Sequence, residues 1–207
     1  MLMAVVAVFV SCSPWTPRER KILSMSDSLM YVAVMPEDSV ILRTACSDFT
    51  DAQLRSPLMK RLVDYMYHTV IDPSQGGVGI AAPQVGISRR LIWVQRFDKA
   101  GEPFECYANI RIDSLIGPVI RGPEGCLSVP PMRGIVPRYS GVVVSYVVPG
   151  GSSRVSEKVE GYTAIIFQHE CDHLDGVLYT DRADSVFVSE EWKAERDGVD
   201  YPRPEWW

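Results

Sequence analysis

The sequence predicts an α+β domain whose strands are mainly antiparallel and pack around one helix that carries an HExxH motif. Two segments, about 57–69 and 162–174, have apolar residues at helical spacing, and two short β-prone runs, 91–94 and 142–148, are separated by turn residues. A mixture of this kind is typical of the α+β class. The chain of 207 residues is most simply one domain, and it is long enough to bury a sizeable core.

The charge and cysteine content exclude several functional classes. The chain has 21 Lys and Arg against 26 Asp and Glu, a net charge of −5, and no basic run that would bind phosphates. The five cysteines are odd in number and include no CxxC pair, which argues against a disulfide scaffold. We therefore expect no nucleic-acid partner, and at least one thiol needs another role.

The N-terminus bears on the compartment. Residues 1–10 are wholly apolar but too few to span a bilayer. The small residues that follow, with Cys12 among them, are typical of a loose lipoprotein cleavage site, although no Lys or Arg precedes the apolar run. A buried N-terminal strand and a misassigned start codon are the alternatives. Residues 15–27, with a charge cluster at 18–21, are expected to form a linker, so that 1–30 precede the domain.

The helices and loops of the domain follow from their boundary residues. Ser56 and Pro57 begin the first helix, and a Gly- and Pro-rich stretch from 70 to 86 predicts loops. The second helix has Gly161 before it and Gly176 after it. We expect the domain to occupy residues 31–184, and residues 185–207 to form an acidic, Trp-rich C-terminal tail.

The second helix carries the strongest local signal, the run His169-Glu170-Cys171-Asp172-His173. Two histidines four residues apart project from one face, so both imidazoles can bind one metal ion. Glu170 lies about 100° round the helix from His169, and it can accept a proton near the metal without binding it. Cys171 points away from His169, so we expect it to pack in the core.

A catalytic metal normally has a third protein ligand. In a metzincin protease this ligand is a histidine six residues after the second one, but Tyr179 occupies that place. A thermolysin-like zinc endopeptidase would use a downstream glutamate, for which Glu190 or Glu191 is a candidate. The other candidate is Cys126, on an extended segment that can bring a thiolate close to the helix.

Three runs, taken in order, resemble the motifs of peptide deformylases. They are Gly77-Val78-Gly79-Ile80-Ala81-Ala82-Pro83-Gln84, Glu124-Gly125-Cys126-Leu127-Ser128 and Gln168-His169-Glu170-Cys171-Asp172-His173. The resemblance covers about residues 31–184. It implies hydrolytic removal of the formyl group from the N-terminal formyl-L-methionine of newly synthesised peptides, with release of formate.

The resemblance implies Cys126, His169 and His173 as the ligands of one Fe²⁺ ion, for which Zn²⁺, Ni²⁺ or Co²⁺ can substitute. A thiolate and two imidazoles suit a borderline divalent metal. Glu170 would take a proton from the attacking water and later return it to the departing amine. The side-chain amide of Gln84 and the backbone N–H of Leu127 would stabilise the oxyanion.

The substrate site follows partly from the residues and partly from the resemblance. Glycines at 77–79 allow the close approach of an extended peptide, and the two isoleucines one turn before the histidines offer an apolar wall to a methionine side chain. The residues expected to bind the peptide are Val78, Gly79, Gly125, Arg133, Tyr162, Ile165 and Ile166.

The expected partners are N-formylmethionyl peptides, including ribosome-borne nascent chains, and a membrane only if Cys12 is lipidated. The resemblance implies a cytoplasmic enzyme, and a lipidated form would be separated from ribosomes. Two other functions stay open: a zinc endopeptidase that uses Glu190 or Glu191, and a formyl-peptide-binding paralogue of weakened activity that could dispense with Glu170. All deformylase positions are present, which favours activity.

Overall fold

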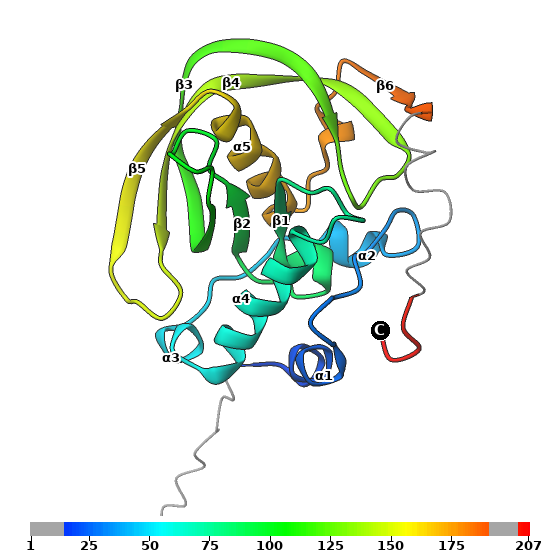
Figure 1. Cartoon of the computed structure of the whole chain (residues 1–207), viewed down its shortest axis with the longest axis vertical. Coiled ribbons are helices and arrows are strands. Elements are labelled where there is room, and N and C mark those ends of the chain that lie inside the picture. The colour runs from blue at the N-terminus through cyan, green and yellow to red at the C-terminus, as the bar shows by residue number, and fades with distance from the viewer. Residues whose placement is uncertain (1–14, 191–202) are drawn as a thin grey trace, which may run out of the picture.

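The computed structural model describes residues 15–190 and 203–207, so the lipoprotein-like segment lies outside the described residues. Figure 1 shows the strands curving around one central helix. The strands form a six-stranded sheet in the order β1-β2-β3-β4-β5, and β6 also pairs with β4. Every pairing of neighbouring strands is antiparallel, which confirms the predicted α+β class. Within the described ranges, no helix combines the length and apolar content needed to cross a membrane.

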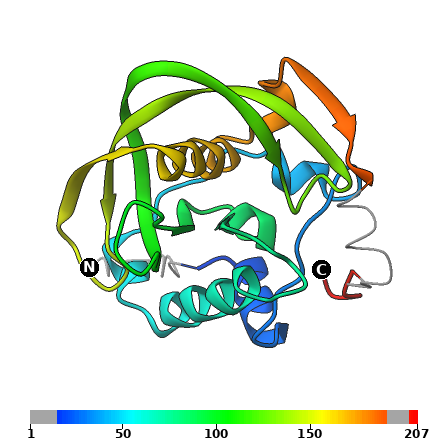
Figure 2. The ribbon, with the colours of Figure 1, turned by 45° about the horizontal axis from the view of Figure 1, so that its top comes forward.

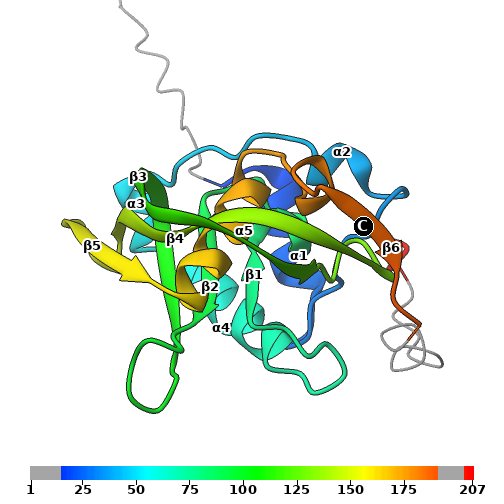
Figure 3. The same cartoon turned by 90° about the horizontal axis from the view of Figure 1, so that it is seen from above.

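The strands differ greatly in length. They are β1 (Gly79–Ala81), β2 (Leu91–Gln95), β3 (Phe104–Gly125), β4 (Met132–Val147), β5 (Arg154–Glu160) and β6 (Ser185–Val188). Strands β3 and β4 form a long hairpin with three register shifts. Figure 3 shows β5 and β6 at opposite ends of β4. Residues 185–188, expected in the tail, thus extend the sheet beside the first residues of β4.

The helices are α1 (Pro17–Met25), α2 (Ser39–Leu42), α3 (Asp51–Leu54), α4 (Pro57–Val70) and α5 (Tyr162–Leu174), with the 3-10 turns η1 (Ala82–Val85) and η2 (Tyr179–Asp181). Both predicted helices are confirmed. The Ser56 side chain caps α4, and Gly161 and Gly176, which flank α5, both have positive φ. Figure 2 shows α5 beneath the arch of β3 and β4, on the opposite side of β1 and β2 from α4.

The segment expected to be a linker is a helix in large part, so that interpretation is wrong. Thr16 and Glu19 form a capping box at the start of α1, with the Thr16 hydroxyl accepting from the Glu19 N–H and the Glu19 carboxylate from the Thr16 N–H. Trp15, Ile22 and Leu23 are buried against the residues of α4. The charge cluster conceals this apolar face, because most of its residues lie on the solvent side of the helix.

Two large buried clusters hold the fold together, and a small third one surrounds Cys126. The first joins α1 and α4 to the face of β1 and β2 that carries Ile80 and Leu91. The second joins α5 to the buried residues of β2, β3 and β4. Cys171 belongs to the second cluster, which confirms its expected place in the core. Because most residues of α5 are buried, their side chains are held in fixed positions.

Candidate active site

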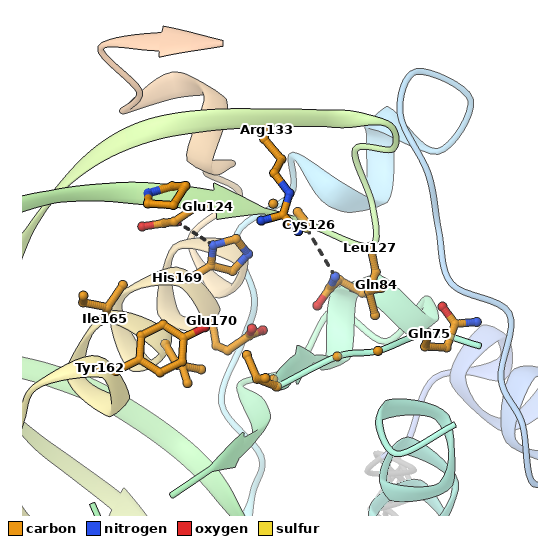
Figure 4. A pocket seen from close by; sticks show the side chains of 17 residues that line it. Gln75, Gln84, Glu124, Cys126, Leu127, Arg133, Tyr162, Ile165, His169 and Glu170 are labelled. Carbon is orange, nitrogen blue, oxygen red and sulfur yellow. Dashed lines mark hydrogen bonds and ion pairs between the residues drawn. The ribbon is translucent and has the colours of Figure 1, made fainter. Parts of the chain in front are cut away.

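Three segments that lie far apart in the sequence meet beside α5. The helix supplies His169, Glu170 and His173, the residues just after β3 supply Cys126 and Leu127, and the β1–η1 segment supplies Gly79 and Gln84. Figure 4 shows the side chains of Gln84, Cys126, Leu127, His169 and Glu170 around one cavity. The antiparallel hairpin brings the end of β3 back over the helix, which is how a thiol distant in sequence reaches the two histidines.

Cys126, His169 and His173 form a group that could hold a metal ion. One ligand atom from each lies within 4.8 Å of the others, and Cys126 Sγ lies 3.1 Å from His173 Nε2. In the part of the chain that the structure describes, this is the one such group of three or more His, Cys, Asp or Glu side chains. Glu190 does not belong to it, and Glu191 lies outside the described residues.

The two imidazoles have different electrostatic surroundings. Burial lowers the pKa of His173, so its ring is neutral and able to coordinate a cation. Burial acts in the same direction on His169, but hydrogen bonds to Cys126 and Glu124 outweigh it and raise the pKa of that ring. A thiolate, a neutral imidazole and a carboxylate-supported imidazole are donors that fit a borderline divalent metal.

Glu124 orients the ring of His169. Its Oε2 accepts a hydrogen bond of 2.8 Å from His169 Nδ1, and its two oxygens accept bonds of 2.8 and 3.0 Å from Arg138. Burial raises the pKa of Glu124, but these partners prevail and hold the pKa at about 2. The carboxylate is therefore charged, and Nδ1 keeps its proton toward it. Nε2 is then the nitrogen that would bind a cation, once the cation has displaced any proton there.

Arg138 and Asp172 extend this support. Arg138 Nη1 lies 2.5 Å from Asp172, whose two carboxylate oxygens also accept hydrogen bonds from Arg182. No role was predicted for Arg138 or Glu124 from the sequence. Glu124 stands inside one of the motifs, which was an available signal, whereas nothing near Arg138 in the sequence indicates its partner.

Glu170 is a buried carboxyl group at the edge of the cavity. Only 4% of the residue is exposed, and its Oε2 has no hydrogen-bond partner among the described residues. Burial raises the pKa of Glu170 to about 7, against the attraction of His169. A Cβ atom at Gly79 would lie 2.5 Å from Glu170 Oε1, so only glycine leaves room for this carboxyl group. A carboxyl group with such a pKa can take up and release a proton near neutral pH.

A hydrogen bond to the side-chain oxygen of Gln84 orients its amide, so that the N–H₂ group faces the thiol of Cys126. Its Oε1 accepts a hydrogen bond of 2.8 Å from the Ala81 N–H. Its Nε2 donates to Ser128 Oγ at 3.1 Å and lies 3.6 Å from Cys126 Sγ. The structure thus places Gln84 across the cavity from Glu170, with Leu127 directly after the thiol (Figure 4).

The predicted substrate-binding residues all line the same cavity. They are Val78, Gly79, Gly125, Arg133, Tyr162, Ile165 and Ile166. Tyr162 is 54% exposed, and Ile166 is 4% exposed, so the walls run from an open rim to a buried apolar end. His173 is not among the lining residues and lies buried behind Cys126. Gly77, expected beside the peptide backbone, lines the cavity as well, and so do Gln75, Gly76 and Pro123, which were not predicted.

Comparisons with known proteins agree on one family. The family model of polypeptide deformylases matches residues 30–187. A peptide deformylase of Symbiobacterium thermophilum is 40% identical over 165 residues, which cover 79% of this chain and 72% of the relative. One of Leptospira biflexa is 38% identical over 153 residues, covering 70% and 84%. The Met-Ala-Ser-bound structure of a class I type b peptide deformylase from Acinetobacter baumannii has 38% identity and a TM-score of 0.67, covering 74% and 98%.

Proposed function

The chain belongs to the peptide deformylase family, hydrolases that remove the formyl group of N-terminal formyl-L-methionine, and we propose that Cys126, His169 and His173 hold its catalytic metal. The observation that carries this proposal is the convergence of one Sγ and two imidazole nitrogens within 4.8 Å. Family membership supports deformylation over a zinc endopeptidase, as does the position of Glu190 outside the group. It also makes a weakened binding protein the lesser alternative, because Glu170 is present and buried in the site.

Family membership supports Fe²⁺ as the physiological ion, with Zn²⁺, Ni²⁺ or Co²⁺ as substitutes, and a thiolate with two imidazoles fits each of these borderline divalent ions. When bound, the ion supplies Lewis acidity to the reacting groups. The protein's part is to hold the three donors and to orient the ring of His169 through Glu124.

We assign proton transfer to Glu170. It takes a proton from the water whose oxygen bonds to the formyl carbon, and it delivers a proton to the amine nitrogen as the C–N bond breaks. Formate and a peptide with a free N-terminus are the products. The raised pKa of Glu170, about 7, supports both directions of transfer. The Gln84 amide and the Leu127 N–H would donate to the developing oxyanion, each stabilising it by about 3 kcal/mol.

The cavity supports a peptide substrate that begins with methionine. Ile165, Ile166 and Val78 provide apolar contacts for a flexible thioether side chain, while Arg133 and Tyr162 lie nearer the polar rim. The Acinetobacter baumannii enzyme has been seen with Met-Ala-Ser bound. We propose that this chain binds formyl-Met peptides in this cavity, with the peptide backbone beside the glycines of 77–79.

The compartment decides which formylated peptides the enzyme meets. A cytoplasmic enzyme would act on ribosome-borne nascent chains, whereas a protein lipidated at Cys12 would act on other formylated peptides at a membrane. Expression of the full chain in a bacterium with a labelled fatty acid separates the two cases. Label that disappears with Cys12→Ala supports the anchored form, and unlabelled protein that begins at Met1 supports the cytoplasmic one.

The activity itself is tested with anaerobically purified, metal-loaded protein and formyl-Met-Ala-Ser. We expect formate and free Met-Ala-Ser, with no cleavage of internal peptide bonds in a longer unformylated peptide. Internal cleavage without formate would support the endopeptidase instead. Tight binding of the formyl peptide without any formate would support the weakened binding protein.

A further inference from the structure

The last residue of the chain packs against the turn that carries Gln84. The described C-terminal residues lie beside α1 (Figure 1). A Cβ atom at Gly86 would lie 2.4 Å from Cη2 of Trp207 and 2.9 Å from Cδ1 of Ile22. Gly86, with φ of +82°, is the residue that ends η1, two residues after Gln84. The indole of Trp207 therefore covers the glycine on which the geometry of this turn depends.

A buried carboxylate connects the same tryptophan to the segment 31–38. Trp207 Nε1 donates to Asp38 Oδ1 at 3.2 Å, and Arg203 forms an ion pair of 3.0 Å with the same oxygen. Asp38 Oδ2 accepts from the Tyr31 hydroxyl at 2.8 Å and from the Val34 N–H at 3.0 Å. The Tyr31 ring packs edge-on against Trp207, with centroids 4.8 Å apart. Asp38, with 1% of its side chain exposed, thus connects Arg203 and Trp207 to the segment 31–38 through hydrogen bonds and an ion pair.

The segment 31–38 in turn bridges the two sides of the candidate active site. The Ala33 N–H donates to the Gln84 carbonyl at 2.7 Å, and the Met35 N–H donates to the Ser128 carbonyl at 2.9 Å. The two acceptor residues, Gln84 and Ser128, are also joined to each other by the hydrogen bond from Gln84 Nε2 to Ser128 Oγ. The backbone of the segment therefore sets the distance between the Gln84 amide and the residues that follow Cys126.

We propose that Trp207 is a positioning residue for Gln84, acting through Gly86 on one side and through Asp38 and the segment 31–38 on the other. This inference rests on the proposed role of Gln84 in stabilising the oxyanion. A donor of this kind contributes only when it is held at hydrogen-bond distance from the developing charge, so loss of its support lowers turnover more than substrate binding.

The test compares Trp207→Ala with Trp206→Ala in the full-length, metal-loaded enzyme. Trp206 is a matched control, because it also packs a half-buried indole on the core but is not the residue that contacts Gly86 or Asp38. We expect Trp207→Ala to speed amide hydrogen exchange at Ala33 and Met35 and to lower kcat about 5- to 50-fold, less than outright loss of an oxyanion donor, while KM stays within about twofold. Trp206→Ala should resemble the parent in both measurements.

A double-mutant cycle shows whether the effect passes through Gln84. In a Gln84→Ala background, Trp207→Ala should lower kcat no further, although it should still speed exchange at Ala33 and Met35. An equal loss of kcat in both backgrounds overturns the inference, and so does unchanged exchange in Trp207→Ala. Should Gln84→Ala alone keep the parental kcat, the proposed role of Gln84 fails, and the exchange measurement still decides whether Trp207 holds the segment. If the alanine variant does not fold, Trp207→Phe replaces it, because phenylalanine keeps a ring against Gly86 but lacks the N–H that donates to Asp38. Amide exchange at Ala33 and Met35 and kcat are then measured in that variant.

Discussion

Glu124 Oε2 accepts a hydrogen bond of 2.8 Å from Nδ1 of His169, across 45 residues of sequence. Arg138 holds the carboxylate from the other side with two hydrogen bonds. The ring of His169 is therefore fixed in orientation before any cation binds, with its Nδ1–H directed at Glu124. Residues in contact with an imidazole in this way are expected to affect metal affinity although they do not touch the metal.

The first prediction concerns this contact. Glu124→Gln replaces a charged acceptor by a neutral amide, so the imidazole loses basicity and orientation, and metal affinity should fall about 10- to 100-fold. Competition between the protein and a chromogenic chelator for Co²⁺ measures this. Glu160→Gln is the control, since Glu160 lies 67% exposed in a surface ion pair with Lys158. If Glu124→Gln and the parent bind Co²⁺ with equal affinity, Glu124 does not support His169 as a metal ligand.

The second prediction concerns the thiol ligand. Cys126→Ser should lose most of its bound metal, because an alcohol is a far poorer ligand than a thiolate for a borderline ion. Cys106→Ser, in which the thiol lies against the α4 side of the core, should keep its metal. Elemental analysis of anaerobically purified protein gives the metal per chain. Full occupancy in Cys126→Ser would rule out Cys126 as the third ligand.

The third prediction tests the space around Glu170. A methyl group at Gly79 would collide with the Glu170 carboxyl group at 2.5 Å, so Gly79→Ala should displace it and lower kcat by a factor of about 10 to 10². A methyl group at Gly122, also in the sheet, would meet nothing within 4 Å. Gly122→Ala should therefore keep the parental kcat. If Gly79→Ala and Gly122→Ala both have the parental kcat, the position of the Glu170 carboxyl group beside Gly79 does not matter for the reaction.

The elements that the sequence predicted are those with clear local boundaries. For α4 and α5 these were a Ser-Pro start and flanking glycines, and the structure places both helices where they were expected. The motif histidines could be placed on one helix face because helical spacing alone determines it. For the same reason Cys171 could be assigned to the core.

The missed features depend on contacts between distant segments. Much of β3 is exposed, so no apolar alternation indicated a strand of 22 residues. The charges of α1 concealed the burial of Trp15, and the pairing of β6 with β4 joins residues about fifty positions apart. The Arg138 contacts with Glu124 and Asp172 have no local signature either. Local patterns cannot show such contacts, because tertiary packing creates them.

The fourth prediction concerns stability and pH. Arg96, with 1% of its side chain exposed, pairs with Asp98, Glu105 and Glu157. Arg96→Met should leave these carboxylates short of a partner and lower the free energy of unfolding by about 2 to 4 kcal/mol at neutral pH, less than for a wholly buried group because the acids are 23–33% exposed.

The pKa of Asp98 is lowered from 3.8 to about 2, chiefly by its hydrogen bond to Arg96. A lowered carboxyl pKa stabilises the fold above the unfolded value, and this stability disappears as the pH falls toward the folded one. The difference in the free energy of unfolding between the parent and Arg96→Met should therefore narrow as the pH falls from about 5 to about 2. Chemical unfolding at several pH values measures it. A gap that is constant or widens on acidification would contradict the assignment.

The most direct test of the proposed mechanism is the rate of formate release by Glu170→Gln. The amide has nearly the shape of the carboxyl group but cannot take a proton from water, so the variant should keep its metal and bind formyl-Met-Ala-Ser with near-parental affinity. Its kcat should fall by a factor of about 10² to 10⁴, the range expected when a general base is lost. Formate release at close to the parental rate by metal-loaded Glu170→Gln would show that another group transfers the proton.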